Sequence, residues 1–184
     1  MPQYRMPAEW EPHEATWLAW PHEKSDWPGK FAPVPWVYGE MVRYLSRVEK
    51  VRILIADEKA ERAARIVLEK SGATMASVEF YRFPTDRSWT RDFCPIFVRS
   101  GDGAVAMAHW RFNGWAKYPN HTLDAAIPAL LRRKLRLPYL KPVESKRHVV
   151  LEGGSIDVNG AGTLLTTEEC LLSPIQARNP GMSR

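Results

Sequence analysis

The residues with the clearest chemical potential lie in the stretch 86–95, Asp-Arg-Ser-Trp-Thr-Arg-Asp-Phe-Cys-Pro. Two carboxylates and two guanidinium groups surround the indole of Trp89 there, directly before the apolar run 96–98. A carboxylate such as Asp92 accepts paired N–H bonds, and an indole face attracts a cation. The pattern therefore suits recognition of a planar cation. The local pattern alone nevertheless favours a charged turn that leads into a strand, and a second stretch shifts the balance.

A second stretch, 151–158, places an acid before two glycines in the order Leu-Glu-Gly-Gly-Ser-Ile-Asp-Val. Gly153 and Gly154 allow backbone or ligand to approach closely. Glu152 and Asp92 both lie at ends of apolar segments, where a carboxylate loses water and needs a cationic partner. A bound substrate is one candidate for that partner. The alternatives are that Asp92 pairs with a neighbouring arginine, and that Glu152 is satisfied by the backbone of the two glycines.

The cysteines and histidines indicate neither a disulfide framework nor a metal site. Cys94 and Cys170 are the only cysteines, and free thiols in a reducing compartment are expected. The five histidines lack metal-ligand spacing, so no metal and no cofactor are predicted. If residues 92–98 are extended, Asp92 and Cys94 share a face of the strand. A role for Cys94 as a substitute nucleophile is still disfavoured, and core packing is expected for Cys170.

Composition favours an ordinary globular protein with one domain over residues 1–184. Apolar residues make up 45% and charged residues 26% of the chain, values typical of a domain with a real core. The net charge of +5 comes largely from a basic run within 132–147, which is typical of a solvated helix face, so nucleic acid is not an expected partner. The absence of a long apolar run and of a signal peptide predicts no membrane association and a cytoplasmic location.

Hydrophobic periodicity predicts that strands and helices alternate in the first half of the chain. A helix is expected over 36–48, and a second helix capped by Asp57 and followed by Gly72. Residues 78–83 are expected to form a strand that is buried on both faces. Further strands are predicted at 15–20 and 51–55. The predicted apolar face of the first helix consists of Val37, Met41, Tyr44, Leu45 and Val48.

The second half of the chain adds two hairpins and two helices, which together with the first half predicts an α/β or α+β fold. Helical spacing covers 123–137, with the firm helix placed after Pro128. Thr166 and Glu169 have the spacing of a capping box that opens a short helix. The predicted strands are 96–98 with 104–110, and 149–158 with 163–166.

Six ordered segments carry a resemblance to a known family: 6–13, 17–21, 88–92, 112–115, 151–156 and 163–172. Through them the chain resembles the N-terminal part of the agmatine deiminases, a group that also covers bacterial-type peptidylarginine deiminases. The resemblance implies a pentein propeller of five ββαβ-like modules around a pseudo-fivefold axis. This chain is similar to about half of such a propeller.

The chemistry implied by the resemblance is hydrolysis of a guanidino group to a ureido group and ammonia. For agmatine, the product is N-carbamoylputrescine, an intermediate of putrescine and polyamine biosynthesis. In the family a thiolate attacks the guanidinium carbon, a histidine moves protons, and water resolves the thiouronium. The resemblance assigns Asp92 and Glu152 as the catalytic carboxylates that hold the guanidinium nitrogens. Trp89 is assigned to the substrate pocket, and we expect Gly153 there as well.

The resemblance also places the catalytic histidine and the nucleophilic cysteine of the family outside this chain. We therefore expect a truncated domain or one part of a split enzyme, without its own nucleophile and inactive alone. Cys94 departs from the family pattern, in which a small residue, commonly glycine, is usual. The expected partners are a small guanidino substrate and either a second copy or the missing C-terminal half. The alternatives are an inactive module that binds guanidino compounds or a partner chain, and a peptidyl-arginine deiminase.

Overall fold

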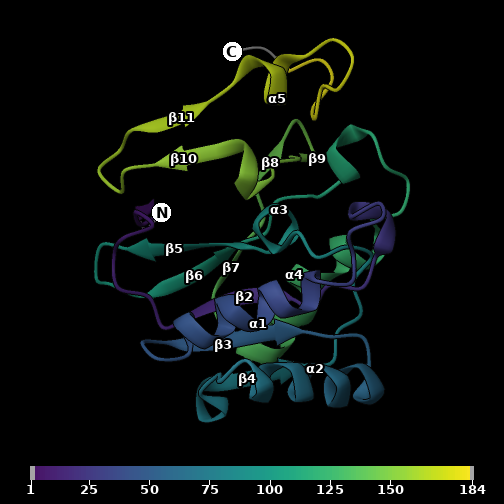
Figure 1. Cartoon of the computed structure of the whole chain (residues 1–184). Coiled ribbons are helices and arrows are strands. Elements are labelled where there is room, and N and C mark those ends of the chain that lie inside the picture. The colour runs from purple at the N-terminus through teal and green to yellow at the C-terminus, as the bar shows by residue number, and fades with distance from the viewer. Residues whose placement is uncertain (1–2, 183–184) are drawn as a thin grey trace. The chain divides into compact units, whose positions relative to one another are not determined.

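The computed structural model describes residues 3–182, which form two compact units (Figure 1). One unit is built from Pro12–Thr90, and the other combines Met1–Glu11 with Arg91–Arg184. Both units contain helices and strands, which confirms the predicted mixed α/β class. A single domain over 1–184 and a half propeller both stay predictions. Among the described residues, no helix is long and apolar enough to cross a membrane.

The Pro12–Thr90 unit is a three-stranded parallel sheet whose strands are connected by helices. The strand order is β2-β3-β4, with Thr16 opposite Val51 and Ile53 opposite Phe80. This arrangement confirms the predicted alternation of strands and helices. In chain order the elements are β2 Ala15–Ala19, the 3-10 turn η1 Lys24–Asp26, α1 Val34–Leu45, β3 Lys50–Leu54, α2 Glu58–Lys70, the 3-10 turn η2 Met75–Ser77 and β4 Val78–Tyr81.

Both helices of this unit cover the same face of the sheet. One buried cluster joins α1, β3 and α2, and it consists of Val42, Val51, Ile53 and Leu68. Helices α1 and α2 also lie side by side (Figure 1). They approach so closely that a Cβ at Gly39 would come within 2.2 Å of the Oγ of Ser71. Only glycine allows that approach, so Gly39 brings the two helices together over the sheet.

The exposed side of α1 corrects an expectation from the sequence. Of the five residues predicted as its apolar face, only Leu45 packs against the core. The helix is buried instead through Val34, Gly39 and Val42, a stripe that includes a glycine and so carries a weak apolar signal. It also begins earlier than predicted, with Pro35 in its first turn. The exposed members of the predicted face are Val37, Met41, Tyr44 and Val48.

The opposite face of this sheet carries charged and aromatic side chains. Arg52 donates a hydrogen bond of 3.0 Å to Glu79, and the rings of Trp17 and Tyr81 lie 4.9 Å apart. All four residues of β4 are half-buried. The prediction that this strand is buried on both faces was therefore wrong, because one of its faces carries this polar layer.

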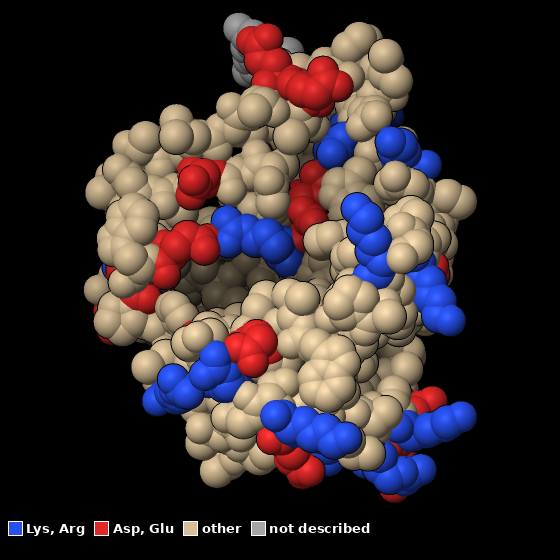
Figure 2. Space-filling model, viewed as in Figure 1, with Lys and Arg blue, Asp and Glu red and all other residues tan. Residues whose placement is uncertain are grey.

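Helix α2 begins and ends where the sequence predicted. The side chain of Asp57 accepts a hydrogen bond of 2.8 Å from the N–H of Ala60, and Gly72 follows the last turn with a φ of +78°. On the helix surface Arg62 forms an ion pair of 2.6 Å with Glu58. Figure 2 shows acidic and basic side chains interspersed over this helix, so its charges largely balance.

The second unit is organised around a four-stranded sheet of order β1-β5-β6-β7. Strand β5 is antiparallel to both β1 and β6, and its turn over 101–103 confirms the predicted hairpin. Helix α4, Thr122–Leu135, leads into β7, which is parallel to β6. The strands are β1 Tyr4–Arg5, β5 Ile96–Ser100, β6 Val105–Ala108 and β7 Tyr139–Leu140.

Helix α4 begins before its proline, contrary to the prediction. Thr122 is its first residue, and Pro128 lies inside the helix. Proline has no N–H, so Pro128 donates no hydrogen bond within the helix. Ile127, Pro128 and Leu131 are all buried, so the proline lies on the buried side of the helix.

Short elements complete the unit. One of them, the helix α5, is capped by Thr167, one residue after the predicted cap. The side chain of Thr167 accepts the hydrogen bond from the N–H of Cys170, at 3.2 Å. The hydroxyl of Thr166, the predicted cap, instead donates to the carbonyl of Ser155 at 2.7 Å. The hairpin predicted around 159–162 is confirmed. These elements are β8 Val143–Glu144, β9 Arg147–His148, β10 Ile156–Val158, β11 Leu164–Thr166 and α5 Glu168–Leu172.

Candidate functional site

Asp92 lies on a one-turn helix, α3, Thr90–Phe93. Phe93 is 2% exposed, and its ring centre lies 6.2 Å from that of Phe112, so the buried ring fixes the turn. The alternative in which residues 92–98 are extended was wrong, because the chain becomes a strand only at Ile96. The shared strand face for Asp92 and Cys94 is therefore lost.

Gly153 and Gly154 lie directly against Arg91 and Asp92. A Cβ on Gly153 would come within 2.5 Å of the carbonyl oxygen of Arg91, and a Cβ on Gly154 within 2.2 Å of the Oδ1 of Asp92. Both distances are far below van der Waals contact. A larger residue at 153 would meet the backbone of Arg91, and one at 154 would displace the side chain of Asp92 or the turn. The two stretches that carry the candidate acids are thus brought together, and the glycines are what allow it.

The carboxylate of Asp92 is half-buried, and it has two N–H donors. The indole of Trp115 and the backbone N–H of Gly154 donate to it. Burial, together with the neighbouring negative charge of Glu152, raises the pKa of Asp92 to about 6. The two donors and the positive charge of Arg91 act in the opposite direction. Asp92 is therefore an anion at neutral pH that gains from a cationic ligand.

Trp115 is a site residue that the sequence analysis missed. It lies in the 3-10 turn η3, Gly114–Ala116, with a φ of 61°, which costs free energy for a bulky residue. Asn113 caps the turn, accepting from the N–H of Ala116 at 3.0 Å, and Phe112 packs edge-on against the indole at 4.9 Å. The sequence offered one general signal, which is that the N–H of a tryptophan usually needs a hydrogen-bond acceptor when the ring is buried.

Glu152 already has a cationic partner in the described chain. It is 1% exposed, and the Nε of Arg178 donates to its two carboxylate oxygens at 3.0 Å and 3.1 Å. Burial raises the pKa of Glu152, while the charge and hydrogen bonds of Arg178 act to lower it. The sequence analysis did not predict this cationic partner, which comes from a segment 26 residues further along the chain. The assignment of Glu152 to substrate binding stays a prediction.

Around Glu152 the backbone is less regular than predicted. The expected strand over 149–158 is reduced to a single bridge between Arg111 and Val150, the 3-10 turn η4 Gly153–Ser155, and β10. The turn is closed by the N–H of Ser155, which donates to the carbonyl of Glu152 at 3.0 Å. This turn presents Gly154 to α3.

Trp89 belongs to the Pro12–Thr90 unit, and its surroundings there are aromatic. Its side chain is 40% exposed, and its ring centre lies 5.8 Å from that of Trp27. It also donates a hydrogen bond to the carboxylate of Asp26. Its assignment to a substrate pocket stays a prediction.

Neither cysteine has the surroundings of an activated nucleophile. Burial and the nearby carboxylate of Asp124 raise the pKa of Cys94, so its thiol stays protonated at neutral pH. Cys170 lies on α5 and is also a free thiol. Within residues 3–182 no cluster of three His, Cys, Asp or Glu side chains forms a metal site.

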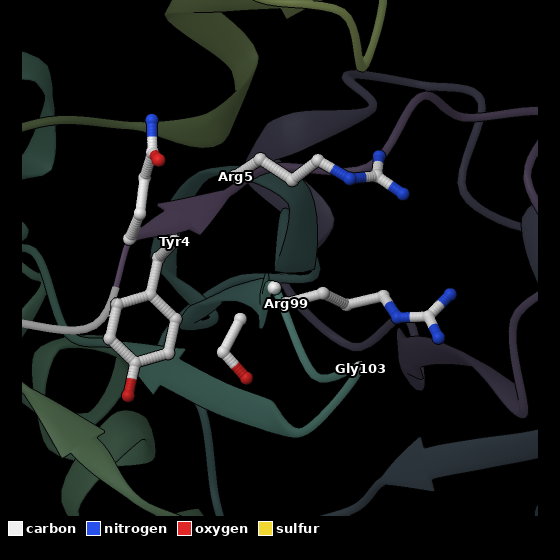
Figure 3. Close-up of a pocket in the computed structure, with 7 residues that line it drawn as sticks. Tyr4, Arg5, Arg99 and Gly103 are labelled. Atoms are coloured by element: carbon white, nitrogen blue, oxygen red, sulfur yellow. The ribbon is translucent and has the colours of Figure 1, made fainter.

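Two hollows open on the second unit, and they differ in charge. The first, of about 580 Å³, includes Gly154 and Arg91 in its wall, the two residues that touch Asp92. The other, of about 360 Å³, is lined by Arg5 and Arg99, whose side chains point the same way from β1 and β5 (Figure 3). The residues described around this second hollow include no carboxylate, so it does not suit a guanidinium ligand.

The sequence of the chain is similar to those of known proteins. Residues 5–184 match the model of the Porphyromonas-type peptidyl-arginine deiminases. The chain belongs to this family. It is 34% identical to the agmatine deiminases of Stutzerimonas stutzeri and Pseudomonas aeruginosa, over 98% of its own length and 47% of theirs.

Solved structures agree with this family membership. The agmatine deiminase of Enterococcus faecalis matches with a TM-score of 0.83 and 28% identity, over 98% of this chain and 47% of that one. The agmatine deiminase of C. jejuni matches with a TM-score of 0.73 and 29% identity, over 92% of this chain and 47% of that one. The chain spans about half the length of the curated relatives that it matches.

Proposed function

We propose that this chain supplies the guanidinium-binding part of an agmatine deiminase, which hydrolyses agmatine to N-carbamoylputrescine and ammonia. The observation that carries the proposal is the contact of Gly153 and Gly154 with Arg91 and Asp92. That contact brings the segments of the half-buried Asp92 and the buried Glu152 together, in a chain one-third identical to agmatine deiminases. Two acids with raised pKa values and few solvent contacts are typical of a site that binds a cation.

In the proposed role, Asp92 binds the guanidinium directly. A guanidinium offers N–H groups in a fixed plane that match the two oxygens of a carboxylate. Binding neutralises the charge of Asp92 and holds the central carbon open to attack, which is the positioning that such a reaction needs. Trp89 is proposed to line the pocket. The attacking thiolate and the proton-moving histidine are those of the family pattern and lie outside these 184 residues.

The fold that goes with this function is proposed to be a pentein propeller, of which the two units form about half. Mixed α/β units and the match to solved agmatine deiminases support this architecture. The product would enter putrescine and polyamine biosynthesis.

Calorimetric titration of the 184-residue chain with agmatine at pH 8 tests the proposal. Putrescine is the matched ligand control, because it keeps an amine and lacks the guanidino group. We expect agmatine to bind and putrescine not to bind. Asp102→Asn is the matched protein control, since Asp102 is an exposed acid in a turn. Equal binding of both ligands, or binding unchanged by Asp92→Asn, would refute the guanidinium site.

A second candidate substrate is a peptidyl arginine, which the name of the matching family model favours. Its side chain carries the same guanidinium, so Asp92 and Glu152 would serve both substrates. Titration with benzoyl-arginine amide beside agmatine separates the two, because only a peptidyl-arginine site tolerates the bulky backbone. Preferential binding of benzoyl-arginine amide would replace agmatine as the proposed substrate.

A further inference from the structure

Arg178 holds the side chain of Glu152 from a segment that follows α5. Its Nε donates to both carboxylate oxygens, at 3.0 Å and 3.1 Å, and its Nη1 donates to the carbonyl of Gln176 at 2.9 Å. The side chains of Arg178 and Glu152 are only 7% and 1% exposed. A guanidinium that is buried and bonded on two sides is fixed in place.

The next residue holds the backbone beside Glu152. The Oδ1 of Asn179 accepts from the N–H of Val150 at 2.8 Å, and its Nδ2 donates to the carbonyl of Val150 at 2.8 Å. Val150 is buried and lies two residues before Glu152. Arg178 and Asn179 therefore grip both the side chain and the backbone of the segment that carries the acid.

We propose that Arg178 is a positioning residue, whose guanidinium keeps Glu152 ionised and oriented so that Asp92 alone neutralises the bound substrate. The inference rests on the proposed function and deepens it. Arg91 is itself paired with Glu9, so Asp92, Glu152 and Arg178 leave the empty site a net charge of −1, and one substrate guanidinium brings that charge to zero. The site would thus be built for a single guanidinium group.

Without Arg178, the neighbouring negative charges of Asp92 and Glu152 would be less compensated. One of them would then hold a proton at neutral pH, as closely spaced acids do. A protonated acid neither attracts a guanidinium nor accepts its N–H groups on both oxygens. The charged groups that face this pair are Arg91, beside Asp92, and Arg178, beside Glu152.

Carboxyl-carbon NMR titration of the unliganded 184-residue chain tests the proposal without any substrate. In Arg178→Gln we expect the pH midpoint of the Asp92–Glu152 pair to rise by about one pH unit or more. Arg178→Lys restores a positive charge, so its midpoint should return most of the way to the wild-type value. Arg62→Gln removes the same charge from an exposed ion pair on α2 and should leave the midpoint unchanged.

A merely structural Arg178 predicts a different pattern: a lower melting temperature with an unchanged midpoint in the folded variant. That result would overturn the proposal. If Arg178→Gln does not fold, Asn179→Ala is used in its place. Asn179→Ala keeps every charge and removes only the two hydrogen bonds between the side chain of Asn179 and the backbone of Val150. A raised midpoint in Asn179→Ala would support the positioning role, and an unchanged midpoint would overturn it.

Agmatine titration of the same variants separates this inference from the proposed function. We expect Arg178→Lys to bind agmatine about tenfold more weakly than wild type, because lysine lacks the planar fork that fixes Glu152. Equal affinity would overturn the orienting role. If wild type itself does not bind agmatine while the midpoints shift as expected, the proposed function fails and the role of Arg178 toward Glu152 stands.

Discussion

Asp92 receives its hydrogen bonds from Trp115 and Gly154, whereas Glu152 is bonded to Arg178. At the scale of single residues, the two acids therefore differ in what they leave open to a ligand. Asp92 has N–H donors but no ion pair of its own among these contacts, and Glu152 is already in a buried ion pair. Substitution at the two positions should accordingly give opposite effects on stability.

Asp92→Asn is expected to stabilise the unliganded chain at pH 8. The pKa of Asp92 is raised in the folded state to about 6, so the folded chain binds this proton more tightly than the unfolded chain. The free energy of unfolding therefore falls as the pH rises from the pKa of this carboxyl in the unfolded chain to about 6, its pKa in the folded chain. Below the unfolded-state pKa the carboxyl is protonated in both states, and this cost is absent. We expect a gain on the order of 2 kcal/mol at pH 8 and no gain near pH 3, measured by urea unfolding. A destabilised variant at pH 8 would contradict this view of Asp92.

Glu152→Gln is expected to destabilise the chain by about 3 kcal/mol, because it leaves the buried guanidinium of Arg178 without an anion. The double variant Glu152→Gln with Arg178→Gln removes both charges and should recover part of that loss. Urea unfolding of the two single variants and the double variant measures the coupling. Strictly additive losses would show that the ion pair has no energetic role.

At the scale of elements, the site depends on the turn η4 resting on α3. Helix α2, the three strands of the parallel sheet and the two hairpins could be predicted from the sequence, because caps, glycine turns and apolar runs are local signals. The short strands β1 and β7 were not predicted. Asp92, Glu152 and Gly153 could be chosen for the same reason. Arg178 and Trp115 could not, because each reaches its acid through a contact that no local pattern encodes. The apolar stripe of α1 was misread because Gly39 packs as a core residue there.

Gly154→Ala tests the contact between η4 and α3. The added methyl group would lie 2.2 Å from Oδ1 of Asp92, so Asp92 or the turn must move. We expect the affinity for agmatine to fall at least tenfold, because the carboxylate of Asp92 would be displaced from the position in which it meets the guanidinium. Gly101→Ala is the matched control, since a Cβ there meets nothing within 4 Å. Equal affinities for the two variants would show that the close approach of Gly154 does not position Asp92.

At the scale of the whole molecule, the described chain holds the two acids that are proposed to bind a cation, and the thiol of Cys94 is not activated. Cys94 keeps its proton because its pKa is raised, and the family pattern places the nucleophile elsewhere. We therefore expect the 184-residue chain to bind agmatine without releasing ammonia. A coupled ammonia assay with wild type and Cys94→Ala measures this. Turnover by wild type that is lost in Cys94→Ala would instead make Cys94 the nucleophile.

The most direct test of the central claim is a crystal structure of the chain with agmatine at pH 8. The account predicts guanidinium nitrogens about 2.7–3.2 Å from the carboxylate of Asp92, with the ion pair of Glu152 and Arg178 intact. Agmatine bound through its guanidinium at another acid, with Asp92 still contacted only by Trp115 and Gly154, would contradict it.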